Sequence, residues 1–93
     1  MNLVDFEAHL KAENYDQRVV WERLPGYALG EHQHAFDACA LITEGDFTLV
    51  VDGVTTNYAA GEIFRLPAGT LHHESAGLSG ARYVVGRRMV AGA

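Results

Sequence analysis

Hydrophobic positions follow two different periods along the chain. In residues 3–13, the apolar residues Leu3, Phe6 and Leu10 recur at helical spacing with charged residues between them. This pattern predicts a short amphipathic helix, for which Asp5 is a candidate N-cap. Because an isolated helix of this length is only marginally stable, a loose N-terminal arm is the alternative interpretation.

After Tyr15, short runs rich in β-branched and aromatic residues alternate with turn signals. Asp52-Gly53 is the clearest hairpin signal, because a tight primed turn needs a positive φ, which glycine adopts without strain. The runs predict eight strands, over residues 17–24, 27–34, 38–43, 47–51, 54–58, 63–66, 71–76 and 81–88. Eight short strands separated by turns are typical of a β-sandwich or a small β-barrel.

The composition limits the domain count and the class of protein. The chain has 93 residues, of which 48% are hydrophobic and 20% charged, close to the averages of globular domains. No linker or change in composition separates a second domain. We therefore expect one β domain over residues 16–93, preceded by a helix or arm over residues 1–15.

Charge and hydrophobicity exclude several partners. Twelve acidic residues outnumber seven basic ones, and the net charge of −5 argues against a nucleic-acid partner, which would need a positive surface. The longest apolar run, residues 38–42, is too short to cross a bilayer, and charged residues interrupt any signal-peptide core. The single cysteine, Cys39, excludes an intrachain disulfide. We expect a cytoplasmic protein with no membrane partner.

Two histidines separated by one residue are the first candidate for chemistry. Residues i and i+2 of a strand point to the same face, so the imidazoles of His32 and His34 can meet at one point. Two exposed histidines on an outer face would explain the pair equally well.

Glycines and a proline frame these histidines in a recognisable order. Residues 26–45 read GYALGEHQHAFDACALITEG, residues 61–76 read GEIFRLPAGTLHHESA, and fifteen residues separate the two segments. The segments are similar to the two motifs of the cupin family, G-x5-H-x-H-x3-4-E-x6-G and G-x5-P-x-G-x2-H-x3-N, with the short interval of microbial members. The resemblance implies an all-β fold, a cupin-type jelly-roll β-barrel of roughly six to eight strands with a metal site inside.

The resemblance also implies a set of metal ligands. His32, His34 and His72 match the metal-binding histidines of the family motifs. The position of the family glutamate is Ala38 and that of the asparagine is Ala76, which leaves the fourth ligand open. Three imidazoles suit a divalent transition metal, whether Zn, Ni, Fe, Mn, Co or Cu, better than Ca or Mg.

Two carboxylates are candidates for the fourth ligand or for a catalytic acid or base. Glu74 follows His72 by two residues, so both side chains share one face of a strand; a glutamate paired with a nearby arginine is the alternative. Asp37 precedes Ala38 and would reach the site only through a bulge; a strand-capping aspartate is the alternative. Cys39 is expected to be a small buried hydrophobe.

The remaining noteworthy side chains are assigned to the surface or the core. His9 and His73 are expected at the surface, and Arg87 and Arg88 in solvent or facing another subunit. Five aromatic residues are expected in the core rather than around a pocket: Phe36, Phe47, Tyr58, Phe64 and Tyr83.

The patterns lead to one functional expectation with alternatives. We expect a small cupin that binds a divalent transition metal through three histidines, and a metal-dependent enzyme acting on a small molecule is one form of it. A non-catalytic small-ligand sensor, or a structural module with little or no metal, is the alternative; the missing glutamate and the lack of a lid-length loop favour it over the enzyme. We also expect a homodimer, because a small open-edged sheet with a modest core favours pairing.

Overall fold

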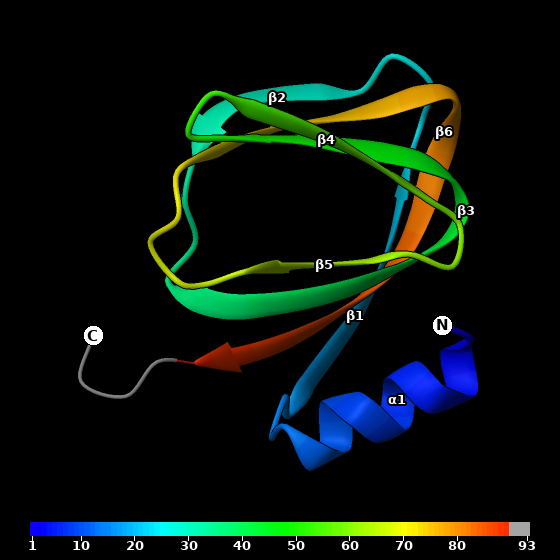
Figure 1. Ribbon diagram of the computed structural model, residues 1–93, viewed down its shortest axis with the longest axis vertical. Coiled ribbons are helices and arrows are strands. Elements are labelled where there is room, and N and C mark those ends of the chain that lie inside the picture. Colours follow the sequence, from blue (N-terminus) through cyan, green and yellow to red (C-terminus); the bar gives the residue numbers. More distant parts are fainter. Residues whose placement is uncertain (90–93) are drawn as a thin grey trace.

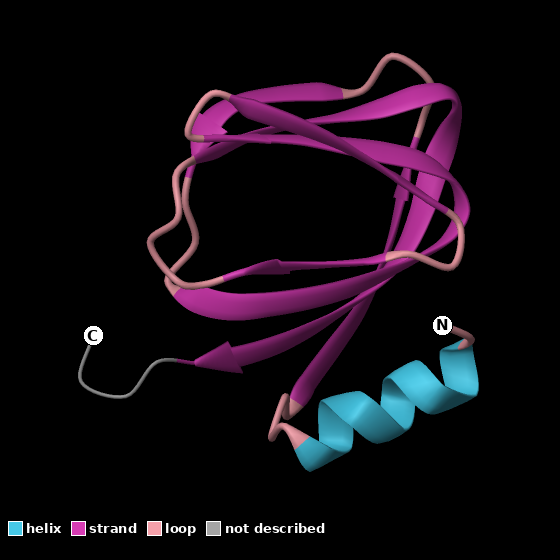
Figure 2. Ribbon diagram, in the orientation of Figure 1, coloured by secondary structure: helices cyan, strands magenta, loops and turns pink. Residues whose placement is uncertain are grey.

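The computed structural model describes residues 1–89 and contains one helix and six strands (Figures 1 and 2). Along the chain these elements are α1 (Leu3–Ala12), β1 (Gln17–Arg23), β2 (Ala28–His32), β3 (Phe36–Val51), β4 (Val54–Ala59), β5 (Ile63–Leu66) and β6 (His72–Met89). The prediction of an all-β jelly-roll fold with a short N-terminal helix is confirmed. Within this part of the chain, α1 is neither long nor apolar enough to cross a membrane.

Two strands are much longer than the sequence predicts, so the prediction of eight strands is wrong. β3 joins the runs 38–43 and 47–51, and β6 joins the runs 71–76 and 81–88. Gly45 and Gly80 have positive φ values of 71° and 75° but lie at irregular points inside continuous strands. A Cβ at Gly45 would overlap the carbonyl oxygen of Gly80, so glycine allows the two strands to cross closely. A glycine between two β-rich runs therefore marked a bend, not a turn.

The two long strands form the frame of the barrel. β3 and β6 pair antiparallel along most of their length. β2 and β1 pair with successive halves of β6, while β5 and β4 pair with successive halves of β3. Because β3 and β6 bend, each runs through both layers, with β2 and β4 in one layer and β1 and β5 in the other (Figure 1).

Alternate residues of β3 face opposite sides of the sheet, and both sides are buried. Ala38, Ala40 and Ile42 face the core inside the barrel, whereas Cys39 and Leu41 pack under α1. This explains the unbroken apolar run, since a strand covered on both faces needs no polar alternation.

The helix covers the outer face of the barrel. Phe6 and Leu10 are buried against Cys39 and Leu41. The helix begins at Leu3 and its N-cap is Asn2, whose side-chain oxygen accepts a hydrogen bond of 2.8 Å from the backbone N–H three residues later. Asp5 is thus not the cap but the residue whose N–H is capped.

Candidate metal centre

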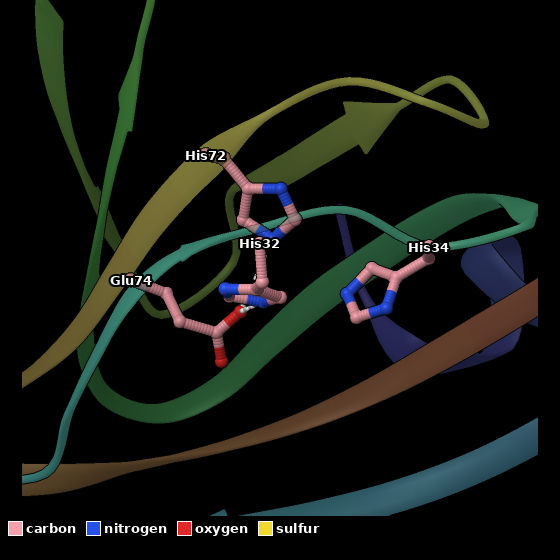
Figure 3. A group of neighbouring side chains, drawn as sticks. All are labelled: His32, His34, His72 and Glu74. Atoms are coloured by element: carbon pink, nitrogen blue, oxygen red, sulfur yellow. Dashed lines mark hydrogen bonds and ion pairs between the residues drawn. The ribbon is translucent and has the colours of Figure 1, made fainter.

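Strand register brings the predicted histidines together. His32 is the last residue of β2 and lies directly opposite His72, the first residue of β6. Glu74 follows two residues later on the same face of β6, and His34 lies between β2 and β3. Each of these four side chains offers one ligand atom, and the four atoms lie within 4.8 Å of one another (Figure 3). We call this set the histidine–glutamate group.

Backbone carbonyls fix the tautomers of two of these histidines. Nδ1 of His32 donates to the carbonyl oxygen of Gly30 at 2.7 Å, and Nδ1 of His72 donates to that of Thr70 at 2.9 Å. A carbonyl oxygen only accepts, so Nδ1 carries the proton and Nε2 of each neutral ring presents a lone pair. Backbone carbonyls that accept from the other ring nitrogen commonly hold metal-ligating histidines in this orientation.

Both Nε2 atoms face the same carboxylate oxygen. Oε1 of Glu74 lies 3.1 Å from Nε2 of His32 and 3.3 Å from Nε2 of His72. His72 is only 1% exposed and Glu74 9%. Two nitrogen lone pairs directed at a buried carboxylate repel it unless protons or a cation lie among them. The donor set therefore fits a metal ion, and these residues would hold it.

His34 completes the group from the loop side. Its ring lies 5.0 Å from that of His32 and 5.2 Å from that of His72, and it stacks on Phe36 at 4.8 Å. Burial lowers the pKa of His34, and the neighbouring imidazoles and the Arg87 guanidinium lower it further. The ring is thus favoured in the neutral form that binds a metal.

A cavity of about 100 Å³ adjoins the group inside the barrel. Its walls are mostly apolar, and they include four of the aromatic residues that the sequence analysis assigned only to the core: Phe36, Phe47, Phe64 and Tyr83. The prediction that these rings pack in the core is confirmed, but the prediction that they do not line a pocket is wrong. The cavity also reaches two arginines, Arg23 and Arg87.

Comparison with known proteins decides the family. The family model described as the cupin domain matches residues 19–85. The chain belongs to the cupin family. No curated protein matches this cupin.

Solved structures share the fold of this cupin at low sequence identity. A structural-genomics protein of unknown function from Rhizobium leguminosarum bv. viciae 3841 is 23% identical, with a TM-score of 0.74 over 78% of this chain and 69% of that one. KdgF from Halomonas sp. is 23% identical, with a TM-score of 0.64 over 76% of this chain and 68% of that one. Bacillus subtilis oxalate decarboxylase, in a structure that concerns its Mn(II) centres, is 21% identical, with a TM-score of 0.69 over 82% of this chain but 22% of that one.

This cupin takes its carboxylate from a different strand than the family motif implies. Ala38, at the position of the motif glutamate, lines the cavity from β3. The carboxylate in the group is Glu74, from β6. Strand parity with His72 was the signal that pointed to it.

The other sequence candidates lie outside the group. Both oxygens of Asp37 are occupied elsewhere: Oδ1 accepts from the backbone N–H of Ala68 at 2.9 Å, and Oδ2 from Arg88 at 3.1 Å. Those contacts hold the pKa of Asp37 below its usual value. Cys39 is buried under α1, and His73 is exposed on the outer face near Glu31. Arg88, expected in solvent or facing another subunit, is partly exposed and pairs with Asp37 within the chain.

Two side chains that the sequence analysis missed hold the far side of Glu74. The hydroxyl of Tyr27 donates to Oε2 of Glu74 at 2.8 Å, and Nη2 of Arg23 lies 4.0 Å from the same oxygen. Burial raises the pKa of the Tyr27 hydroxyl, and the hydrogen bond to the carboxylate raises it further, so it stays a donor. Arg23 also donates to the hydroxyl of Tyr83 at 3.1 Å. No local motif marks these residues, because their partners lie 47 to 60 positions away.

Proposed function

We propose that this cupin binds one divalent transition metal through the histidine–glutamate group. The supporting observation is that Nε2 of His32 and Nε2 of His72 both face Oε1 of Glu74, at 3.1 Å and 3.3 Å. A cation among these three atoms would stabilise the arrangement, and imidazole nitrogen with carboxylate oxygen is a donor set that transition metals accept. The backbone contacts of both Nδ1 atoms support the same conclusion, since they orient Nε2 before any ion arrives.

The number of protein ligands affects which metals keep an open coordination position for a further ligand. Zinc is commonly complete with four protein ligands, whereas ions that prefer six retain open positions beside the histidine–glutamate group. We therefore favour Mn, Fe, Co or Ni over Zn for a functional site. The oxalate decarboxylase with a similar fold has Mn(II) centres, which agrees with this preference.

We propose further that the site is that of a metal-dependent enzyme acting on a small molecule in the adjoining cavity. When bound, the ion would supply a Lewis acid for an oxygen atom of that molecule. The chain supplies mostly apolar walls and a carboxylate held in place by Tyr27 and Arg23. Glu74 provides the carboxylate whose absence at Ala38 favoured a non-catalytic module.

Metal titration with a neighbouring pair of histidine variants tests the metal site. We expect wild-type protein to take up about one equivalent of Co²⁺ or Ni²⁺, monitored by calorimetry and by the absorption of bound Co²⁺. His72→Ala should weaken binding at least 100-fold, whereas His73→Ala removes an exposed imidazole from the opposite face and should bind like wild type. Equal affinities of the wild type and His72→Ala, or no uptake by either, would contradict the proposal.

The expected homodimer stays a prediction. Its mass in solution, measured by size-exclusion chromatography with light scattering, checks it.

A further inference from the structure

Arg87 is a charged side chain in the mostly apolar wall of the cavity. It follows Tyr83 and Val85 at alternate positions of β6, and all three side chains line the cavity. Its guanidinium carbon lies 4.7 Å from the centre of the Phe36 ring, which stacks on His34. Arg87 thus shares the cavity wall with His32, His34 and Glu74 of the histidine–glutamate group.

Arg87 has an unfilled hydrogen-bonding group. Its Nε is buried and has no hydrogen-bond partner within residues 1–89. Three other arginines in this range each lie within 4.0 Å of a carboxylate: Arg18 near Glu7, Arg23 near Glu74 and Arg88 near Asp37. A buried cationic donor without an acceptor costs free energy, and it is the kind of group that a ligand satisfies.

The cavity is positive although the protein is acidic. The charged residues of its wall are two arginines, Arg23 and Arg87, and one carboxylate, Glu74. A divalent ion in the histidine–glutamate group would add to that excess of positive charge. The whole chain has a net charge of −5, so the excess is a local property of the site. Such a site favours an anion, and more so because low-dielectric walls strengthen the attraction.

The size and walls of the cavity favour a short organic acid as the anion. The cavity has a volume of about 100 Å³. Ala38 is the register partner of Arg87 on β3, and both residues line the cavity. Aromatic and aliphatic side chains form most of the remaining wall and suit a carbon skeleton.

We propose that the ligand of this cupin is a short carboxylic acid whose carboxylate binds Arg87 while another part of it reaches the histidine–glutamate group. Guanidinium groups bind carboxylates through paired N–H donors, and Nε is one of the donors such a pair uses. The proposal deepens the proposed metal-dependent function and rests on it for the second contact. It assigns the anion contact to Arg87.

A matched pair of probes tests the contact. Propanoate and propanamide have nearly the same shape, but only propanoate is charged. We would titrate each into metal-free and Co²⁺-loaded protein at constant ionic strength, and follow binding by amide chemical shifts. We expect wild-type protein to bind propanoate at least 10-fold more tightly than propanamide, as a charge-assisted contact implies.

Arginine variants then assign the preference to one side chain. Arg87→Gln should weaken propanoate binding about 10- to 100-fold and leave propanamide binding unchanged. Arg87→Lys, which keeps the charge but loses the paired donors, should fall between Arg87→Gln and wild type. Arg82→Gln is the control, since Arg82 lies on the same strand but is exposed and outside the cavity wall.

Each result has a definite meaning. Equal binding of the two probes by wild type, unchanged propanoate affinity in Arg87→Gln, or an equal loss in Arg82→Gln overturns the assignment. The metal titration is a separate measurement on the same protein. Propanoate selectivity that depends on Arg87 without any metal uptake would overturn the metal function and leave the anion contact standing. Metal uptake without that selectivity would support the metal function and overturn the anion contact at Arg87.

Discussion

The hydroxyl of Tyr27 lies 2.8 Å from Oε2 of Glu74, on the side of the carboxylate away from the histidines. The other oxygen, Oε1, is thereby directed at Nε2 of His32 and of His72. Tyr27 belongs to the segment between β1 and β2, so a residue outside the strands orients a ligand on β6.

Removing this hydroxyl should weaken the metal site without removing a ligand. We expect Tyr27→Phe to lower the affinity for Co²⁺ about 10- to 100-fold, because outer-shell partners of metal ligands have effects of that order. Calorimetric titration measures the affinity. Tyr58→Phe is the control, since Tyr58 packs against the core and is not part of the histidine–glutamate group. Equal affinities in the two variants would show that Tyr27 does not position Glu74.

The contacts of Asp37 should make folding stability depend on acid pH. Hydrogen bonds from Ala68 and Arg88 lower the pKa of Asp37 in the folded protein relative to about 3.9 in the unfolded chain. A lowered folded-state pKa stabilises the protein above the unfolded value, and this stabilisation is lost as the pH falls through the folded value. We expect Asp37→Asn to be less stable than wild type at pH 7, with the gap closing as the pH falls below the unfolded-state pKa and through the lower folded-state pKa.

Urea denaturation from pH 7 down to pH 2 measures that gap. Asp16→Asn is the control at an exposed position. A gap between Asp37→Asn and wild type that is constant over the whole range would refute the role of the Asp37 carboxylate charge.

The packing of α1 should control access to Cys39. The cysteine is fully buried, and burial raises the pKa of its thiol, so native protein should not react with a thiol reagent at pH 8. Leu10→Ala should lower the free energy of unfolding by about 2–4 kcal/mol and make the thiol reactive before global unfolding. Val4→Ala, on an exposed position of the same helix, should do neither. A thiol as slow in Leu10→Ala as in wild type would mean that α1 does not protect it.

The crossing of β3 and β6 should tolerate no side chain at Gly45. Gly45 and Gly53 both have positive φ, 71° and 76°, but only at Gly45 would a Cβ meet backbone atoms. Gly53→Ala should therefore cost about 1–2 kcal/mol from the φ value alone. Gly45→Ala should cost at least about 2 kcal/mol more, because the backbone of β6 must move. Denaturation midpoints compare the two variants, and similar losses would contradict the close crossing.

Much of the fold could be predicted because its signals are local. The spacing of glycines, proline and histidines in residues 26–76 indicated a cupin barrel, and the periodicity of Phe6 and Leu10 indicated the helix. The number of strands could not be predicted, since Gly45 reads like a turn unless its contact with Gly80 is known. That contact joins residues far apart in the chain.

Part of the candidate site could also be predicted from local signals. Parity related Glu74 to His72, and the same rule applied to Tyr83, Val85 and Arg87 would have directed Arg87 inward. Parity favoured Glu74 over Asp37 but could not exclude a bulge that turns Asp37 inward. Excluding Asp37 depends on its contacts with residues 31 and 51 positions away, which only the folded barrel brings near.

The bend of β6 has a consequence for ligand size. His72 and Glu74 lie near the start of this strand and Arg87 near its end, and the strand bends between them around Gly80. The spacing between the two ends of the cavity is therefore a property of the backbone, which no exchange of side chains at either end alters. A cupin with two residues inserted at the bend would keep Arg87 on the same face of β6, and it would present the same chemical groups to a molecule of different length.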